Sequence, residues 1–379
     1  MGRFTNPRDL YFGEGARHEV KNLKGKKAII VSGGSSMRRG GFLQDVEADL
    51  KEGGFEVKLF EGVESDPSIE TVMKGAEAMR EFEPDWIIAI GGGSPIDAAK
   101  AMWVFYEYPE ESFDNIIQPF SFPELRQKAH FCAISSTSGT ATEVTAFSVI
   151  TDYAKGIKYP LADFNITPDV AIVDPELTYT MPAKLCAHTG MDALTHAIEG
   201  YITKGHCTIS DMFHLEAIKL ISENLRGAVQ NTPEGREGMA LGQYIAGMGF
   251  SNVGLGIVHS MAHGLSALYD TPHGVACAIL LPVGLEYNKT VAGERYRAVG
   301  KAMGVKGIDE MNDAQAADAT IAAVKQLSAD VGIPANLNGI LKEEDIQFLA
   351  ESAYADACRP GNPRDTSVEE IVELYKSQL

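Results

Sequence analysis

The chain has 379 residues, of which 45% are hydrophobic and 22% charged, and its formal net charge is −19. This length exceeds what one hydrophobic core usually holds, which predicts two domains. The negative charge disfavours nucleic acid or an anionic membrane surface as the main partner. It does not exclude a phosphate-bearing cofactor, because backbone amides and a few arginines can hold phosphates locally.

The amino-terminal segment and the cysteines indicate the compartment. Residues 1–15 lack the apolar stretch of a signal peptide. The longest apolar stretch, near residues 275–285, is too short to cross a bilayer. The five cysteines are scattered and form no CxxC pair, which is typical of reduced thiols. We therefore expect a cytoplasmic protein with no membrane partner.

The first part of the chain alternates β-rich runs with helical runs. The expected strands are 26–32, 55–60, 85–90 and 130–135. The loop 33–41 follows the first strand, helical spacing covers 42–54 and 68–82, and glycine-rich turns follow the later strands. This order predicts a Rossmann-like α/β domain with a mostly parallel sheet and helices on both faces, which we place at residues 1–182.

After residues 174–182 the pattern changes. The helical stretches are 186–202, 211–225, 320–332 and 368–379, several of them bounded by glycine or proline. We find no convincing strand after about residue 180. The second domain, residues 183–379, is therefore predicted to be all-helical.

A glycine-rich turn joins the strand 85–90 to a helix. Ser94 is a candidate N-cap, Pro95 suits the first helical position, and Asp97 lies where it can reach back to the helix start. The preceding Gly92 and Gly93 would let a diphosphate approach the backbone at the positive end of the helix. The turn lacks the GxGxxG spacing. Alone, it is also compatible with a tight turn that binds nothing.

The loop after the first strand, residues 33–41, indicates which coenzyme the protein prefers. An acidic residue usually contacts the ribose 2′-hydroxyl of NAD, but no acid occurs here before Asp45. Two serines and two arginines are present instead, which suits a 2′-phosphate and favours NADP(H) over NAD(H). A solvated basic turn is the alternative. The loop residues expected to contact the cofactor are Gly33, Gly34, Ser35, Ser36 and Arg38.

The stretch 136–145 is a third loop after a strand, and it is rich in small hydroxyl side chains. Such a loop is weak evidence alone, because serine and threonine loops are common. Three loops of this kind at successive strand ends are much stronger, since ligands bind at the carboxyl ends of parallel strands.

The second domain carries a candidate metal site. Asp192 and His196 are four residues apart, as are His259 and His263, so each pair shares a helix face. His273 follows a proline and is expected to open a new helix or turn. With nitrogen and oxygen donors, iron, manganese, zinc or cobalt would all be suitable. Each residue alone has a structural explanation, and the remaining histidines, His18, His130, His188, His206 and His214, are taken as structural.

Four long segments together resemble one known family, the iron-dependent (group III) alcohol dehydrogenases. These segments are residues 85–100, 136–144, 189–201 and 258–282. The resemblance covers nearly the whole chain. Its second half is most similar to the lactaldehyde reductase branch, and its first half to the NADPH-linked alcohol and butanol dehydrogenases.

The resemblance implies roles for particular residues. The metal ligands for Fe²⁺, or for Zn²⁺ as in some members, would be Asp192, His196, His259 and His273. His263 would lie beside the metal and relay a proton. The cofactor contacts implied in the first domain are Gly92, Gly93, Ser94, Ser136, Thr137, Thr140 and Lys158. Asp97, at the start of the same helix as Ser94, is also expected to belong to the cofactor site.

Three positions are informative when compared with the family pattern, and two of them, Phe147 and Cys277, depart from it. NAD-preferring members carry Asp at the position of Gly33, which agrees with NADP(H). Phe147 replaces an Asn close to the expected nicotinamide, so the exact substrate stays open. Cys277 replaces an Asn of many relatives, and we interpret it as a packing change.

The expected activity is the interconversion of small primary alcohols and aldehydes, with lactaldehyde and 1,2-propanediol among the candidates. NADP(H) would lie in a cleft between the domains, and a metal would polarise the substrate oxygen. A homodimer or higher homo-oligomer is expected from the family. The alternatives are a glycerol dehydrogenase-like or butanol dehydrogenase-like relative that uses zinc, or a dehydroquinate synthase-like enzyme. More remote alternatives are a metal-dependent hydrolase and a non-catalytic binding protein.

Overall fold

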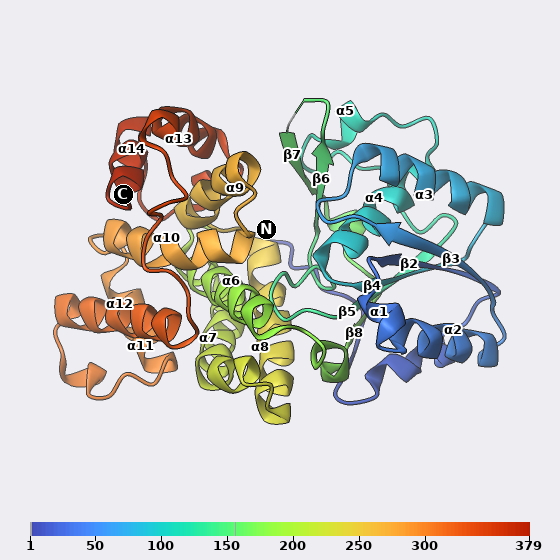
Figure 1. The fold of residues 1–379 in the computed structure, drawn as a ribbon, viewed down its shortest axis with the longest axis horizontal. Helices are drawn as coiled ribbons and strands as arrows, with labels where there is room; N and C mark the ends of the chain where they lie inside the picture. The colour runs from blue at the N-terminus through green and yellow to red at the C-terminus, as the bar shows by residue number, and fades with distance from the viewer. Residues whose placement is uncertain (1, 156) are drawn as a thin grey trace. The chain divides into compact units, whose positions relative to one another are not determined.

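The structure is a computed structural model that describes residues 2–155 and 157–379. Contacts within the chain divide it into two compact units, Met1–Met181 and Pro182–Leu379 (Figure 1). The predicted cofactor loops belong to the first unit and the predicted metal residues to the second.

A parallel sheet forms the centre of the first unit. Its strands, with the hairpin β6–β7 that lies outside it, are β1 (Asp9–Phe12), β2 (Lys27–Gly33), β3 (Glu56–Val63), β4 (Trp86–Gly91), β5 (His130–Ser135), β6 (Phe147–Asp152), β7 (Ile157–Ala162) and β8 (Val170–Val173). The strand order is β1-β8-β5-β4-β2-β3, and all neighbouring strands of this sheet are parallel. The predicted mostly parallel sheet is confirmed.

Helices cover both faces of this sheet. They are α1 (Ser36–Arg39), α2 (Phe42–Glu52), α3 (Ile69–Phe82), α4 (Gly93–Glu107) and α5 (Phe113–Ile116). In β4, Ile87 and Ala89 pack in the core formed with α3 and α4, whereas Ile88 and Ile90 pack in the core formed with α2. Because both faces are buried, these strands read as continuous apolar runs.

Two local expectations were wrong. The predicted loop 33–41 contains a helical turn, α1. Helix α4 begins at Gly93 with Gly92 in the N-cap position, so Ser94 is not the N-cap. The helix can start early because Gly91 adopts φ 145°, which other residues rarely reach. A Cβ there would also approach Pro95 Cγ to 2.6 Å.

The strand order places two of the predicted loops side by side. The chain passes from β2 to β3 on one side and then to β4 on the other, so the order reverses between β2 and β4. A ligand of an open α/β sheet binds at such a switch point, outside the carboxyl ends of the strands. These ends are Gly33 and Gly91.

The second unit consists of helices, and the described residues after Val173 form no strand. The helices are α6 (Ala183–Ile202), α7 (Thr208–Val229), α8 (Pro233–Val253), α9 (Ile257–Tyr269), α10 (His273–Asn288), α11 (Gly293–Ala302), α12 (Asp313–Asp330), α13 (Ile346–Ala355) and α14 (Val368–Lys376). Helix α10 packs against both α6 and α9, and these three helices carry the predicted metal residues.

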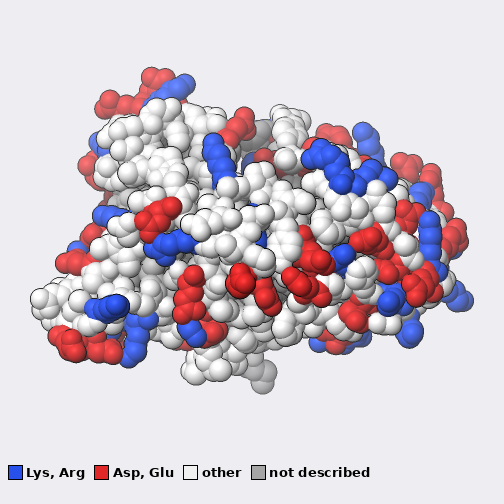
Figure 2. Space-filling view, turned by 60° about the horizontal axis from the view of Figure 1, so that its bottom comes forward, with Lys and Arg blue, Asp and Glu red and all other residues white. Residues whose placement is uncertain are grey.

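Two features of the described residues bear on possible partners of the protein. No helix there has both the length and the apolar character needed to cross a membrane. On the face drawn in Figure 2, Lys and Arg side chains are interspersed with Asp and Glu.

Candidate active site

Two of the predicted cofactor loops of the first unit touch each other. A Cβ added to Gly92 would lie 3.3 Å from Thr137 Cγ2, and one added to Gly93 would lie 3.3 Å from Thr140 Cγ2. The loop after β5 therefore packs on the backbone at the start of α4. Larger residues at either glycine would push the two loops apart.

This loop pair has the properties of a phosphate and ribose site. The hydroxyls of Thr137 and Ser138 are buried, and neither has a hydrogen-bond partner among residues 2–155 and 157–379. Helix α4 has no side-chain cap, so the N–H groups of its first turn can bind an anion. These groups fit the diphosphate of a dinucleotide.

Lys100, on α4, binds the loop that follows β5. The sequence analysis did not identify this residue. Its buried ammonium donates to the carbonyls of Thr142 (2.7 Å), Thr145 (2.6 Å) and Phe147 (2.9 Å). Burial raises the pKa of the neighbouring Asp97 carboxyl, and the charge of Lys100 opposes that shift. Lys100 therefore links α4 to the hydroxyl loop and to β6.

The two arginines of the first loop have different surroundings. Arg38 is paired with Glu61, through Nε at 2.8 Å and through a second nitrogen. Arg39 donates to the hydroxyl of Ser35 at the turn itself. Among the described residues, no carboxylate forms an ion pair with Arg39, so Arg39 together with Ser35 offers the better place for a 2′-phosphate.

Lys158, on β7, is ion-paired with Asp66 at 2.9 Å. The hairpin is also fixed to this segment by the bond from Thr151 N to Pro67 O, at 2.8 Å. The ion pair holds Lys158 near the segment between β3 and α3. The sequence analysis did not predict Asp66 as its partner.

In the second unit, three predicted ligands converge. Oδ1 of Asp192 lies 3.7 Å from Nε2 of His259 and 3.6 Å from Nε2 of His273. Cys277 joins them, and one donor atom from each of these four residues lies within 4.8 Å of every other. Sequence reasoning took Cys277 as packing, because a thiol one turn beyond a histidine carries no separate signal.

His196 lies next to this group. Its ring stacks on that of His259 with centroids 4.4 Å apart, and on the other side against Phe250 at 4.2 Å. His196 is not one of the four residues whose donor atoms lie within 4.8 Å of one another. His196 thus shares the site through stacking on His259.

The converging atoms fit a divalent cation. Oδ1 of Asp192 and Nε2 of His259 are buried, and neither has a hydrogen-bond partner in the described residues. Burying such atoms unpaired is costly, and a metal ion would satisfy both. Nitrogen and oxygen donors suit iron or zinc.

A buried carboxylate on α6 orients His259. Glu199 Oε2 lies 2.6 Å from Nδ1 of His259, so Nδ1 carries the proton and Nε2 is left as the acceptor facing Asp192. Oε1 of Glu199 also accepts from Val258 N at 2.8 Å. Because Glu199 lies seven residues after Asp192, its helical spacing could have revealed it.

Burial and neighbouring groups change the pKa values of Asp192 and His273 in directions that suit metal binding. The pKa of His259, in contrast, is raised against the effect of burial by its contacts with Cys277, Asp192 and Glu199. Burial alone would raise the pKa of Asp192, but His196, His273 and His259 together lower it below its usual range. Burial lowers the pKa of His273 to about 3, so its ring is neutral at pH 7. Both changes favour the protonation states that metal ligands require.

His263 lies beside the group as expected. Its ring stacks on His273 with centroids 5.2 Å apart, and its Nδ1 lies 2.8 Å from Oδ2 of Asp356. The side chain is 36% exposed. Asp356, which sequence reasoning missed, leaves Nε2 of His263 free to exchange a proton.

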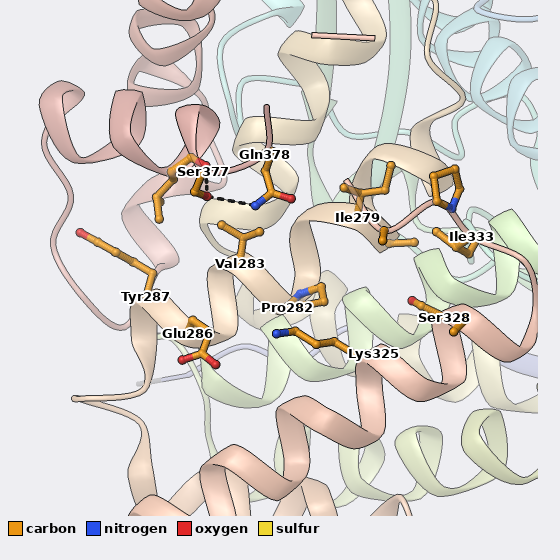
Figure 3. Close-up of a pocket in the computed structure, with 15 residues that line it drawn as sticks. Ile279, Pro282, Val283, Glu286, Tyr287, Lys325, Ser328, Ile333, Ser377 and Gln378 are labelled. Carbon is orange, nitrogen blue, oxygen red and sulfur yellow. Dashed lines mark hydrogen bonds between the residues drawn. The ribbon is translucent and has the colours of Figure 1, made fainter. Parts of the chain in front are cut away.

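A separate pocket lies on another face of α10. It has a volume of about 540 Å³ and is lined by α10, α12 and the end of α14, with Pro282, Val283 and Lys325 among its residues (Figure 3). None of the predicted site residues lines it, so the candidate chemistry lies elsewhere.

Comparison with known proteins identifies the family of the chain. A family model for iron-containing alcohol dehydrogenase matches residues 7–175, and one for the C-terminal part of the Fe-containing alcohol dehydrogenase family matches residues 186–379. The chain belongs to the iron-containing alcohol dehydrogenase family. It is an oxidoreductase that acts on alcohols and aldehydes with a nicotinamide coenzyme.

Individual relatives cover the full length. The chain is 55% identical to the NADPH-dependent butanol dehydrogenase of Clostridium saccharobutylicum, over 99% of this chain and 97% of the relative. It is 44% identical to the lactaldehyde reductase of Escherichia coli K12, over 96% of each. A solved structure of 1,3-propanediol oxidoreductase superposes with a TM-score of 0.95 at 36% identity, over 100% of both chains. The predicted family and fold are confirmed.

Proposed function

We propose that the enzyme interconverts small aldehydes and primary alcohols, with one divalent cation held in the second unit and NADP(H) held on the first. The ligands would be Asp192, His196, His259 and His273. The observation that carries this proposal is the convergence of two buried, unpartnered atoms, Asp192 Oδ1 and His259 Nε2. Iron is favoured by the family description, and zinc is the alternative.

The bound cation would supply Lewis-acid polarisation of the substrate oxygen, and the coenzyme would supply or accept the hydride. The side chains of the protein would orient the metal ligands and supply a proton to the substrate oxygen. Glu199 fixes the tautomer of His259, and Asp356 fixes that of His263. His263 would hold a proton at Nε2 and exchange it with the substrate oxygen or a water molecule.

The hydroxyls of Thr137 and Ser138 and the start of α4 would bind the coenzyme diphosphate, beside Gly92, Gly93 and Thr140. Ser35 and Arg39 would bind the 2′-phosphate. The name of the butanol dehydrogenase relative supports NADP(H).

The names of the relatives also indicate the substrate class. Lactaldehyde, butyraldehyde and their alcohols are the first candidates. A panel of small aldehydes, each tested with NADH and with NADPH, and with added Fe²⁺ or Zn²⁺, ranks substrate, coenzyme and metal together. Turnover of none of the aldehydes would refute the substrate class.

The metal site has a direct test. In the His259→Ala variant, bound metal and turnover should both be lost, whereas the matched variant His206→Ala, at a histidine outside the site, should keep both. Full metal content and an unchanged rate in His259→Ala would overturn the ligand assignment.

We further propose that the chain forms a homodimer or a higher homo-oligomer in a reducing cytoplasm. β1 lies at an edge of the sheet, and Phe12 on it is 65% exposed; an open edge can pair with a second copy. All five cysteines are free. Light scattering that gives the mass of one chain would contradict the oligomer.

A further inference from the structure

Cys277 lies inside the candidate metal group. It is on α10, one helical turn after His273, and its side chain is fully buried. Its Sγ is 3.5 Å from Nε2 of His273, which is the ring nitrogen that also faces Asp192. The thiol is therefore directed toward the same point as the other donors.

The distances match those between ligands of one metal ion. At usual bond lengths, two nitrogen or oxygen ligands of a tetrahedral zinc lie about 3.4 Å apart, and a sulfur and a nitrogen ligand about 3.6 Å apart. Asp192 Oδ1 lies 3.7 Å from His259 Nε2 and 3.6 Å from His273 Nε2, and the sulfur lies 3.5 Å from His273 Nε2. Small side-chain adjustments would place all four around one ion.

Packing alone does not explain this arrangement. The thiol stands next to a buried carboxylate oxygen and a buried ring nitrogen that lack partners in the described chain. A thiol is a weak hydrogen-bond donor and cannot satisfy both. The other cysteine nearby, Cys358, belongs to a different group, with His263 and Asp356.

We propose that Cys277 is a further, sulfur ligand of the cation that Asp192, His196, His259 and His273 would bind, and that it makes the site prefer Zn²⁺ or Co²⁺ over Mn²⁺. This inference rests on the metal site of the proposed function. On binding, the S–H bond breaks, a metal–sulfur bond forms, and the proton leaves to solvent. Thiolate ligands favour softer metals, whereas carboxylates and water suit Mn²⁺.

The test uses the full-length protein loaded with Co²⁺. The wild type should show a sulfur-to-cobalt charge-transfer band in the near ultraviolet, and Cys277→Ser and Cys277→Ala should lose it. The matched control Cys358→Ser should keep the band, because its sulfur lies outside the group. Competition with a chelator should show Zn²⁺ affinity reduced by about tenfold or more in the Cys277 variants, with a smaller change for Mn²⁺. Circular dichroism verifies that each variant is folded.

The outcomes separate the two proposals. If Asp192→Asn abolishes Co²⁺ binding while Cys277→Ala keeps the band and the affinity, the sulfur ligand is refuted and the metal site stands. If neither variant changes metal binding, or if the wild type binds none of Fe²⁺, Co²⁺ and Zn²⁺, both proposals are refuted. A wild type that binds Fe²⁺ but neither Co²⁺ nor Zn²⁺ refutes the sulfur ligand with its metal preference and leaves the metal site standing. A band lost equally in Cys358→Ser would assign the sulfur ligand to the other cysteine and overturn the role of Cys277.

Discussion

The carboxylate of Glu199 lies 2.6 Å from Nδ1 of His259 and accepts hydrogen bonds from the backbone N–H groups of both Val258 and His259. One side chain on α6 therefore caps the start of α9 and orients the imidazole that α9 carries. A Cβ at Gly256 would approach Oε1 of Glu199 to 2.8 Å, so this close contact depends on a glycine.

Glu199→Gln tests this relationship. An amide nitrogen in place of Oε2 cannot accept from Nδ1, so the ring would turn to the tautomer with its proton on Nε2, where it cannot bind a metal. We expect metal affinity to fall by about 10- to 100-fold, measured by chelator competition. In the His259→Ala background the same change should cost no further affinity. Asn362→Ala, which removes the bond to Ile257 N at the same helix start, should lower thermal stability and leave metal affinity near the wild-type value.

Gly274→Ala should disturb the metal site through backbone contact. Alanine normally stabilises a helix relative to glycine by about 1 kcal/mol. At Gly274, however, the added Cβ would lie 2.2 Å from the carbonyl oxygen of His188. The start of α10, with His273, would be displaced from α6. We expect lower metal content and a lower melting temperature. Gly293→Ala is the matched control, because its Cβ would meet no atom closer than 3.9 Å; equal effects in both variants would contradict the prediction.

Lys100→Met should loosen the coenzyme loop. The change keeps the length of the side chain but leaves the three carbonyls that its ammonium binds without that donor. Leaving a buried polar group unpaired costs about 1–3 kcal/mol. We expect the free energy of unfolding to fall by about 3 kcal/mol, and the KM for coenzyme to rise more than kcat falls. The control is Lys155→Met, at an exposed lysine that pairs with Asp152, and it should change neither the free energy of unfolding nor the KM for coenzyme. An unaltered KM for coenzyme in Lys100→Met would argue against a role of Lys100 in the coenzyme loop.

Arg39→Ala should alter coenzyme choice. A charged hydrogen bond to the 2′-phosphate contributes about 1.5–3 kcal/mol, so kcat/KM with NADPH should fall by roughly 10- to 100-fold. With NADH, which lacks this phosphate, the value should stay within about twofold. Arg8→Ala, outside the coenzyme loops, is the control. Equal losses with both coenzymes would show that Arg39 has a structural role only.

The buried side chain of His214 is expected to make the free energy of unfolding depend on pH. It is fully buried, and neither ring nitrogen has a hydrogen-bond partner within the described residues. Burial lowers its pKa from 6.5 to about 3. As the pH falls below 6.5, the unfolded chain therefore takes up a proton that the folded chain does not, and the free energy of unfolding decreases.

Because of His214 alone, the free energy of unfolding should decrease by about 2 kcal/mol between about pH 7 and pH 5. Urea unfolding at both pH values should show a steeper decline in the wild type than in His214→Phe or His214→Leu. The comparison uses the difference between pH values within each protein, so it does not depend on the absolute stability of a variant. Parallel declines would mean that His214 does not titrate between the two states.

The sequence by itself determined the parallel sheet, the all-helical second unit and the two pairs of candidate site residues that share a helix face. Apolar runs such as 85–90 mark strands buried on both faces, and the four-residue spacing of Asp192 and His196, or of His259 and His263, places each pair on one side of a helix. These features are local, because strand and helix geometry depend on residues close in the chain.

Tertiary structure alone decided which side chains meet across elements. Glu199 reaches His259 from another helix, Lys100 binds three carbonyls of a distant loop, and Cys277 joins the donor group only because α10 packs on α6 and α9. The early start of α4 at Gly93 likewise depends on the backbone of Gly91. Such contacts arise from packing between segments far apart in sequence. Local spacing can place Glu199 on the same helix face as Asp192, but it does not show which side chain of another helix Glu199 meets.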